Sequence, residues 1–230
     1  MLGTIVNALA IVAGTALGLI LKSGIRDNYR ETIMNAIGLS VLLIGMIGAI
    51  KTNNLLLLIF SLAIGSVIGE ALKIEDRLAG LGRLIESKTS STDGSVAKAF
   101  VTASLVFCVG SMAIVGSIES GLTGNHQTLF AKAVLDGIVS IFLSSTLGFG
   151  VIFSAAAVFV YQGIITLLSS SLKAFLTDAM IQEISAVGGV LIMAIGLNML
   201  NIKKIKVGNM LPAIVLPFLY FFVKKALGMG

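Results

Sequence analysis

Charged residues are scarce in this chain: they make up 12% of its 230 residues, whereas 57% are hydrophobic. Soluble domains carry about 25% charged residues and roughly 45–50% apolar ones. The mean hydropathy of +1.05 is correspondingly high. This deficit of charge argues against an ordinary soluble domain. The composition therefore predicts an all-α, polytopic membrane protein, a helical bundle dissolved in lipid.

Cysteine and histidine are nearly absent, and each absence excludes a kind of site. Cys108 is the only cysteine, so the chain can form neither an internal disulfide nor a cysteine metal cluster. His126 is the only histidine, and no HExxH helix or phosphate-binding glycine loop occurs. The sequence predicts no cofactor and gives little support to metal- or nucleophile-based enzyme chemistry. A membrane enzyme that uses aspartate or glutamate stays an alternative.

Hydrophobic segments recur along the whole chain at lengths that suit membrane helices. A helix needs about 20 apolar residues to cross a hydrocarbon core of roughly 30 Å. The predicted spans are 2–21, 33–50, 54–72, 99–118, 129–145, 151–168, 185–202 and 208–224. About eight spans is the preferred count, and seven is the alternative if one central segment only dips into the membrane. Residues 1–230 are therefore interpreted as one transmembrane domain.

The net charge of +5 is interpreted as a signal of membrane orientation and not of nucleic-acid binding. With the N-terminus outside, eleven Lys and Arg residues lie in inner loops and four lie in outer segments. The eleven are Lys22, Arg26, Arg30, Lys73, Arg77, Arg83, Lys88, Lys98, Lys203, Lys204 and Lys206. This bias predicts an outside N-terminus and a cytoplasmic connection at 73–98. The apolar spacing in 78–85 predicts an amphipathic surface helix in that connection.

Two pairs of similar strings suggest an internal repeat. GTIVNALAIVAG is similar to GVIFSAAAVFVYQG, and AIGLSVLLIGMIG to AVGGVLIMAIGLN, at offsets of 147 and 150 residues. The strings predict an inverted repeat that relates 1–72 to 150–224, with 73–98 and the central helices 99–145 between the two units. Inverted repeats are typical of secondary transporters. The alternative is that short Gly/Ala/Ile-rich strings align by chance.

The fourth predicted span contains residues that loosen a helix. Its string GSMAIVGSIE places Gly110 and Ser111, then Gly116 and Ser117, before Glu119. Glycine costs about 1 kcal/mol relative to alanine inside a helix, and serine hydroxyls can satisfy freed backbone groups. Unwound backbone at membrane depth is tolerated only where it is buried in protein or lines a water-filled cavity. We therefore predict a broken helix that forms a binding site near the bilayer midplane. For Glu119 the alternative is an ordinary interfacial acid.

Four more polar residues lie inside predicted spans. Lys132 and Asp136 are spaced i, i+4 and share one helical face. A charged residue in mid-membrane costs roughly 2.5–3.5 kcal/mol on insertion, so it usually faces the bundle interior and functions there. The pair is predicted to contact or gate a substrate; the alternative is a self-neutralising pair with Lys132 reaching toward the interface. Asn7 and Gln162 lie in the two helices that the repeat pairs, where they either line the site or simply bridge helices.

The strings FCVGSMAIVGSIESGLTGN, KAVLDGI and LGFGVIFSAAAVFVYQG resemble a bacterial family of uncharacterised membrane proteins, domain of unknown function 554 (YdfK/YqgA-like). The resemblance extends over essentially the whole chain. It implies a multi-pass protein of the bacterial inner membrane. It brings no substrate, activity or site residues with it, so a functional prediction depends on the residues themselves.

Those residues predict a transporter or channel for a small solute or ion. Acids outnumber bases among the candidate site residues, which favours a small polar or cationic solute. The expected partners are the lipid bilayer and this solute, with no nucleic acid, and a homodimer is the oligomeric state considered. The competing hypothesis is a non-transporting scaffold or signalling component that uses the surface helix within 73–98.

Overall fold

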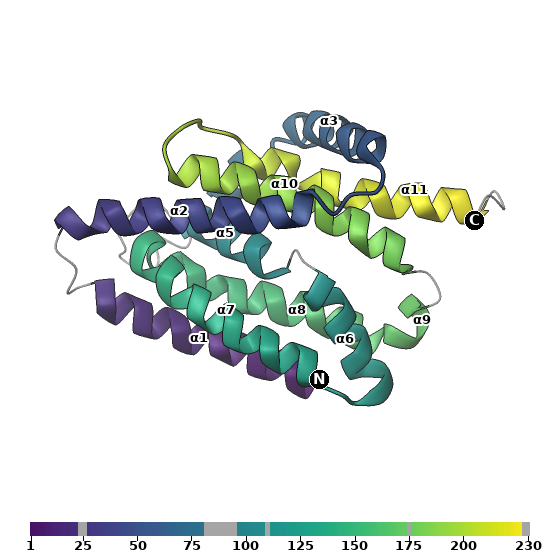
Figure 1. The fold of residues 1–230 in the computed structure, drawn as a ribbon, viewed down its shortest axis with the longest axis horizontal. Helices are drawn as coiled ribbons and strands as arrows, with labels where there is room; N and C mark the ends of the chain where they lie inside the picture. Colours follow the sequence, from purple (N-terminus) through teal and green to yellow (C-terminus); the bar gives the residue numbers. More distant parts are fainter. Residues whose placement is uncertain (23–26, 81–95, 109–110, 174–175, 227–230) are drawn as a thin grey trace.

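The computed structural model describes residues 1–230 except 23–26, 81–95, 109–110, 174–175 and 227–230. Within the described residues all regular secondary structure is helical (Figure 1). The elements are α1 (Leu2–Lys22), α2 (Asp27–Ala49), α3 (Leu55–Ala71), α5 (Val96–Cys108), α6 (Ser111–Thr123), α7 (Gln127–Leu147), η1 (Phe149–Ile152), α8 (Phe153–Leu167), α9 (Ser169–Lys173), α10 (Asp178–Met199), η2 (Val207–Ile214) and α11 (Val215–Ala226). A short helix, Ile74–Gly80, follows α3. The predicted all-helical class is confirmed.

Among the described residues, five helices are long and apolar enough to cross a membrane, and two bent pairs raise that number to seven. One pair is α3 with Ile74–Gly80, bent by 54°, and the other is α5 with α6, bent by 60°. In α2 the apolar part is the shorter helix Asn35–Ala49, where the span 33–50 was predicted. These helices support a multi-pass membrane protein, whereas the count of eight spans stays a prediction.

The fifth and sixth predicted spans are separate helices because the chain turns at a glycine between them. Gly148 has φ 85°, a left-handed conformation that glycine adopts without a steric penalty. Its amide donates to the Ser144 carbonyl oxygen at 2.9 Å and so closes the end of α7. The chain then enters the short helix η1 and continues into α8.

Helix α1 lies along α7 in the same direction, at a distance that only small residues allow. Near the start of both helices Gly3 lies against Leu129, and farther along Gly14 lies against Gly137. A Cβ atom added at Gly14 would be 2.2 Å from the Gly137 carbonyl oxygen. Membrane helices associate through such small residues, because lipid provides no hydrophobic force between them. Gly14 is therefore a packing residue of the contact between α1 and α7.

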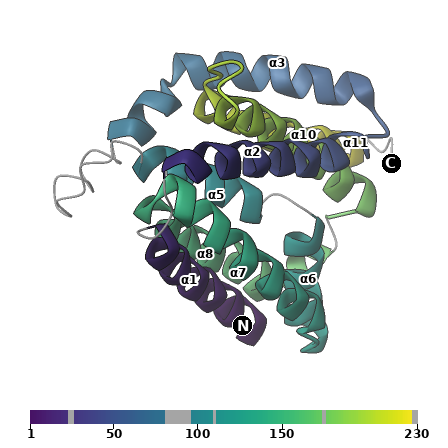
Figure 2. The ribbon, with the colours of Figure 1, turned by 60° about the vertical axis from the view of Figure 1, so that its left-hand side comes forward.

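Helix α2 lies along α10 in the opposite direction. Gly38 lies against Leu200 near the start of α2, and Gly48 lies against Gly189 near its end. In Figures 1 and 2 α2 and α10 run together on one side of the molecule, with α3 beyond them, whereas α1, α7 and α8 form the other side. An antiparallel pairing of α2 with α10 is compatible with an inverted repeat, and the repeat itself stays a prediction.

The first part of the connection 73–98 forms the Ile74–Gly80 helix, and the predicted surface helix beyond it lies outside the described residues. Two carboxylates fasten this region and the end of α3 to Lys206 and the start of η2. Glu75 Oε2 accepts the amide of Gly208 at 2.6 Å, and Glu70 accepts Asn209 Nδ2 at 2.5 Å and Lys206 Nζ at 3.0 Å. The hydrogen bond to Glu70 raises the pKa of Lys206 above its usual value.

A substitution at Gly14 tests the close contact between α1 and α7. Gly14→Ala is expected to lower the unfolding temperature of the detergent-purified protein, because the new methyl group has no room beside Gly137. Gly163→Ala is the matched control, since a Cβ there meets only Met1 Cε, at 3.5 Å. Alanine improves helix propensity by about 1 kcal/mol, so the control should be neutral or stabilising. Equal effects of the two substitutions would contradict the close approach.

Membrane orientation can be measured at the two ends of the antiparallel pair α2 and α10. Lys51 follows α2 and Lys203 follows α10, so the two lysines lie at opposite ends of the bundle. In a Cys108→Ser background, the predicted outside N-terminus places Lys51 outside. A membrane-impermeant maleimide added to intact cells should label a Lys51→Cys variant and leave a Lys203→Cys variant unlabelled until the cells are lysed. The reverse pattern would place the N-terminus in the cytoplasm.

Candidate functional site

Helix α7 carries an ion pair in the interior of the bundle. Lys132 and Asp136 are only 7% and 6% exposed. The Lys132 ammonium lies 2.8 Å from Asp136 Oδ1 and 2.7 Å from Oδ2. The i, i+4 spacing seen in the sequence places both side chains on the same face of α7. The ammonium is directed at the carboxylate, so Lys132 does not reach toward the membrane interface.

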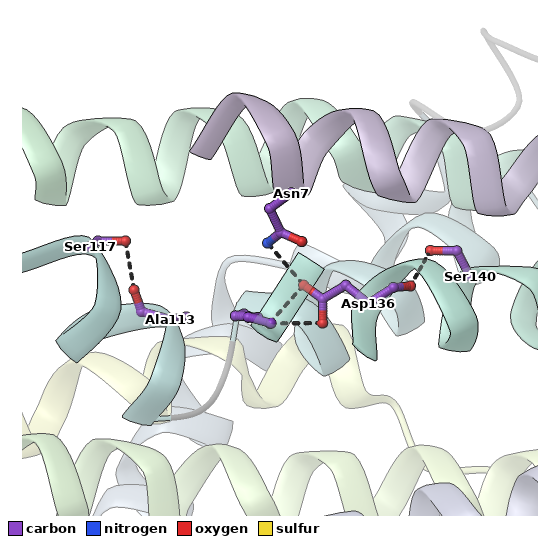
Figure 3. Close-up of polar contacts among 6 residues, drawn as sticks. Asn7, Ala113, Ser117, Asp136 and Ser140 are labelled. Carbon is purple, nitrogen blue, oxygen red and sulfur yellow. Dashed lines mark hydrogen bonds and ion pairs between the residues drawn. The ribbon is translucent and has the colours of Figure 1, made fainter. Parts of the chain in front are cut away.

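Helix α1 completes this cluster with an amide. Asn7 is fully buried, and its Nδ2 donates to Asp136 Oδ2 at 3.0 Å (Figure 3). Its Oδ1 has no hydrogen-bond partner among the described residues. On the α7 side, the Ser140 hydroxyl donates to the backbone carbonyl of Asp136 at 2.6 Å. Asn7 reaches Asp136 because Gly14 and Gly137 let α1 and α7 lie so close together.

Lys132 and Asp136 depend on one another, because either charge would be unpaired in the interior without the other. A buried charge that loses its partner typically destabilises a protein by about 3–5 kcal/mol. The buried Lys132 ammonium and the Asp136 carboxylate neutralise one another, and Asn7 adds a third hydrogen bond to the carboxylate. This arrangement holds a carboxylate at membrane depth in a charge-balanced state. Another cation that reached Asp136 would have to take the place of the ammonium.

The predicted fourth span consists of two helices that meet beside this pair. Helix α5 ends at Cys108 and α6 begins at Ser111, with a bend of 60° between them. Both α5 and α6 pack against α7, the helix that carries the pair. Gly110 lies outside the described residues, as does the side chain of Ser111. The span therefore changes direction between the end of α5 at Cys108 and the start of α6 at Ser111.

The second Gly-Ser pair, Gly116 and Ser117, lies inside the continuous helix α6. The helix is therefore not unwound at this pair, contrary to the prediction from the sequence. A Cβ at Gly116 would be 2.9 Å from Thr128 Cγ2, which makes this glycine a contact point with α7. The Ser117 hydroxyl donates to the carbonyl of Ala113 at 2.6 Å, within its own helix (Figure 3). Close packing therefore explains Gly116, and a local hydrogen bond satisfies Ser117 without unwinding the backbone.

Glu119 is not brought to the ion pair. Its carboxylate accepts Asn125 Nδ2 at 2.6 Å and the Thr128 hydroxyl at 2.7 Å, so it fastens the turn between α6 and α7. Thr128 precedes Asp136 by eight residues on α7, which is about 12 Å at roughly 1.5 Å per residue. The structure thus favours the interpretation of Glu119 as an acid at the end of the span.

Gln162 lies on α8, which packs against α1 and α6. Its side chain is fully buried, and neither amide atom has a hydrogen-bond partner among the described residues. Buried polar atoms are nearly always paired with protein, ordered water or a ligand. Gln162 and Asn7 therefore each carry atoms that can receive a polar ligand. Within the described part of the chain, no three His, Cys, Asp or Glu side chains group together in a way that could hold a metal ion.

The sequence analysis missed Glu183, which is 3% exposed near the start of α10. Its carboxylate accepts the Thr52 hydroxyl at 2.6 Å and the backbone amides of Asn53 and Asn54 at 2.8 and 3.0 Å. The span predicted to begin at residue 185 excluded it. The signal was Thr177, whose hydroxyl accepts the Met180 amide as an N-cap and marks an earlier helix start.

Removing one partner of the buried pair should be far more harmful than removing one partner of an exposed pair. Lys132→Met leaves the Asp136 carboxylate unpaired and is expected to reduce the free energy of unfolding by about 3–5 kcal/mol. Lys206→Met is the matched control because its bridge to Glu70 is 61% exposed on both sides, and an ion pair so exposed to solvent contributes little to stability. Unfolding in detergent measures both. Similar losses would contradict a buried, charged pair.

Comparisons with known proteins place these residues in a family. Residues 2–222 match the family described as "Protein of unknown function (DUF554)". The chain is 39% identical to "Uncharacterized membrane protein YdfK" of Bacillus subtilis (strain 168), over 100% of this chain and 99% of that protein. It is 29% identical to "Uncharacterized protein YqgA" of Escherichia coli (strain K12), over 94% of each.

No solved structure matches the chain. The relative's name and the apolar helices agree on a multi-pass membrane protein. The family match covers nearly the whole chain, including α7 with its ion pair and the broken span α5–α6. The chain therefore belongs to the DUF554 family of proteins.

Proposed function

We propose that the protein is a transporter or channel that moves a small polar or cationic solute across the membrane, with Asp136 as the group that receives positive charge. One observation carries this proposal: the Lys132–Asp136 pair, with Asn7 bound to the same carboxylate, is buried inside the helical bundle. Ionisable residues at membrane depth are costly and usually mark solute or ion pathways. A protein that needed only helix packing would gain nothing from this pair.

In this proposal Lys132 neutralises the site when no solute is bound. An arriving cation or ammonium group would bind Asp136 and release the Lys132 ammonium. The free Oδ1 of Asn7 would accept a further hydrogen bond or contact the cation. Gln162 would contribute from α8, where its amide has no partner among the described residues. The exchange of one positive charge for another keeps the buried site neutral throughout, which avoids the cost of an isolated carboxylate.

The bend between α5 and α6 supports movement at this site. Because the span is made of two short helices, α6 can change its angle to α5 without the loss of long helical segments. The hydrogen bond from Thr128 to Glu119 joins α6 to the first turn of α7. A change in the angle of α6 would therefore act on the helix that carries Lys132 and Asp136. Broken helices beside the substrate site are common in secondary transporters.

A non-transporting scaffold is the second candidate, and one observation favours it. In α6, Gly116 packs against Thr128, and Gly121 packs against Thr166 and Ser169. Helix packing is therefore enough to explain both glycines. The scaffold hypothesis extends this explanation to the whole interior and predicts no solute movement. The outside N-terminus and the homodimer stay predictions. Neither the transporter nor the scaffold requires them.

Flux through the purified protein in liposomes separates the two candidates. Wild-type protein is screened for movement of Na⁺, K⁺, protons and small polar solutes. Asp136→Asn should then reduce the observed flux at least about tenfold, because losing a charge-assisted hydrogen bond costs about 1.5–3 kcal/mol. Asp76→Asn is the control, since Asp76 is exposed on the short helix after α3. Equal flux in Asp136→Asn would remove Asp136 from the mechanism, and no flux in any wild-type assay would favour the scaffold.

A further inference from the structure

A cavity lies away from the ion pair, between α2, α6 and α10. Its volume is about 340 Å³, at the lower end of the roughly 300–1,000 Å³ typical of ligand pockets. Lys51, Asp178 and Gln182 line one end, Ile192 lies farthest from that end along α10, and Val115 of α6 also lines the cavity. No residue of the Lys132–Asp136–Asn7 cluster lines it. The cavity is therefore a separate feature of the fold.

The cavity extends from one end of the bundle to the broken span. From Asp178 to Ile192 the lining follows α10 for fourteen residues, about 21 Å at roughly 1.5 Å per residue. This is more than half of a hydrocarbon core of roughly 30 Å. The lining also includes Val115, which belongs to α6. A solute that entered at Asp178 could thus reach the helix that adjoins the proposed site.

The end near Asp178 carries charges of both signs. Lys51 and Asp178 are both exposed and line the same cavity, and neither forms an ion pair with any other described residue. Most of the other lining side chains are aliphatic: Ile181 and Ile192 are buried, and Ile44 and Ile47 are partly exposed. A ligand that satisfies this lining needs a positive and a negative group at one end and a short apolar part at the other.

Ser185 provides an independent sign that the cavity receives a polar group. It lines the cavity and is 8% exposed, and its hydroxyl has no hydrogen-bond partner among the described residues. Serines inside helices usually donate to the carbonyl of the preceding turn, as Ser117 and Ser140 do here. The Ser185 hydroxyl is left available at the point where the charged end meets the aliphatic walls.

The charged end is held in place before any ligand arrives. Glu183 fixes the loop that follows Lys51 through its hydrogen bonds to Thr52, Asn53 and Asn54. The Gln182 side chain donates to the Lys51 carbonyl and accepts Asn53 Nδ2 at 3.2 Å. Binding sites whose residues are already positioned lose less entropy on binding. The buried Glu183 carboxylate has no cationic partner among the described residues, and positioning this loop accounts for its place in the fold.

We propose that this cavity binds a small zwitterion of the amino-acid type with a short aliphatic side chain, and that it is the vestibule through which this solute reaches the broken span. The ammonium group lies toward Asp178, the carboxylate toward Lys51, and the aliphatic part along Ile44 and Ile192. The role as a vestibule rests on the proposed transport function. The binding itself does not, and it is measured without any flux.

The single native cysteine makes the cavity easy to probe. In a Cys108→Ser background, Ser185→Cys should react with a charged, water-soluble methanethiosulfonate reagent in detergent. Ala186→Cys is the matched control, because the neighbouring side chain is fully buried in the core and does not line the cavity. Labelling of Ser185→Cys as slow as that of Ala186→Cys would overturn the inference, since the cavity would then be closed to water and solutes.

L-valine is the probe for the ligand class. It should slow the labelling of Ser185→Cys several-fold, whereas isobutylamine, which lacks the carboxylate, and isovalerate, which lacks the ammonium group, should protect weakly. Lys51→Gln and Asp178→Asn should each remove the protection by L-valine, measured as the ratio of the labelling rates with and without L-valine in the same variant. Equal protection by all three compounds, or no protection by L-valine, would overturn the assignment to a zwitterion.

The two proposals fail in different ways. If L-valine protects Ser185→Cys but no solute crosses liposomes, the cavity is a ligand site and the transport function is wrong. If flux depends on Asp136 but the cavity neither reacts nor binds L-valine, transport stands and the vestibule is wrong. Circular dichroism and gel filtration of each cysteine variant show that a slow reaction does not come from a misfolded protein.

Discussion

The ion pair between Lys132 and Asp136 is the interaction that most constrains the rest of the structure. A charged group inside a bilayer is tolerated only when it is neutralised or hydrated, so α7 must be surrounded by helices that exclude lipid from both side chains. Helix α1 does this on one side and brings Asn7 to the carboxylate. On another side, both α5 and α6 pack against α7. The helices that pack against α7 thus surround a polar point in an otherwise apolar molecule.

Close helix contacts position this centre. Lipid competes equally well with any apolar side chain, so the helices are held by small residues that bring backbones together. Gly14 and Gly137 do this for α1 and α7, and Gly48 and Gly189 do it for α2 and α10. These contacts leave almost no freedom for the helices to slide past one another. Movement would instead come from α6, which is short, joined to α5 at a bend, and adjacent to the α2–α10 cavity.

Carboxylates hold the loops at both ends of the bundle. At the end where α10 begins, Glu183 accepts three hydrogen bonds from residues 52–54. At the end where α10 finishes, Glu70 and Glu75 fasten Lys206 and the start of η2 to the helices around residue 72. Glu70, Glu75 and Glu183 therefore fasten loops, whereas the buried counter-charge of Asp136 is a lysine on the same helix. This division explains why a count of acids in the sequence does not locate the site.

The sequence by itself determined the helical membrane class, because a chain with 12% charged residues cannot cover a soluble surface. It also determined the Lys132–Asp136 contact, since the i, i+4 spacing in one helix fixes it without reference to any other helix. Only the tertiary structure decided that Asn7 joins the pair and Glu119 does not, because both depend on which helices lie side by side. It likewise placed the bend before Ser111 and left Gly116 in a straight helix, since a glycine loosens a helix only where its neighbours do not hold it in place.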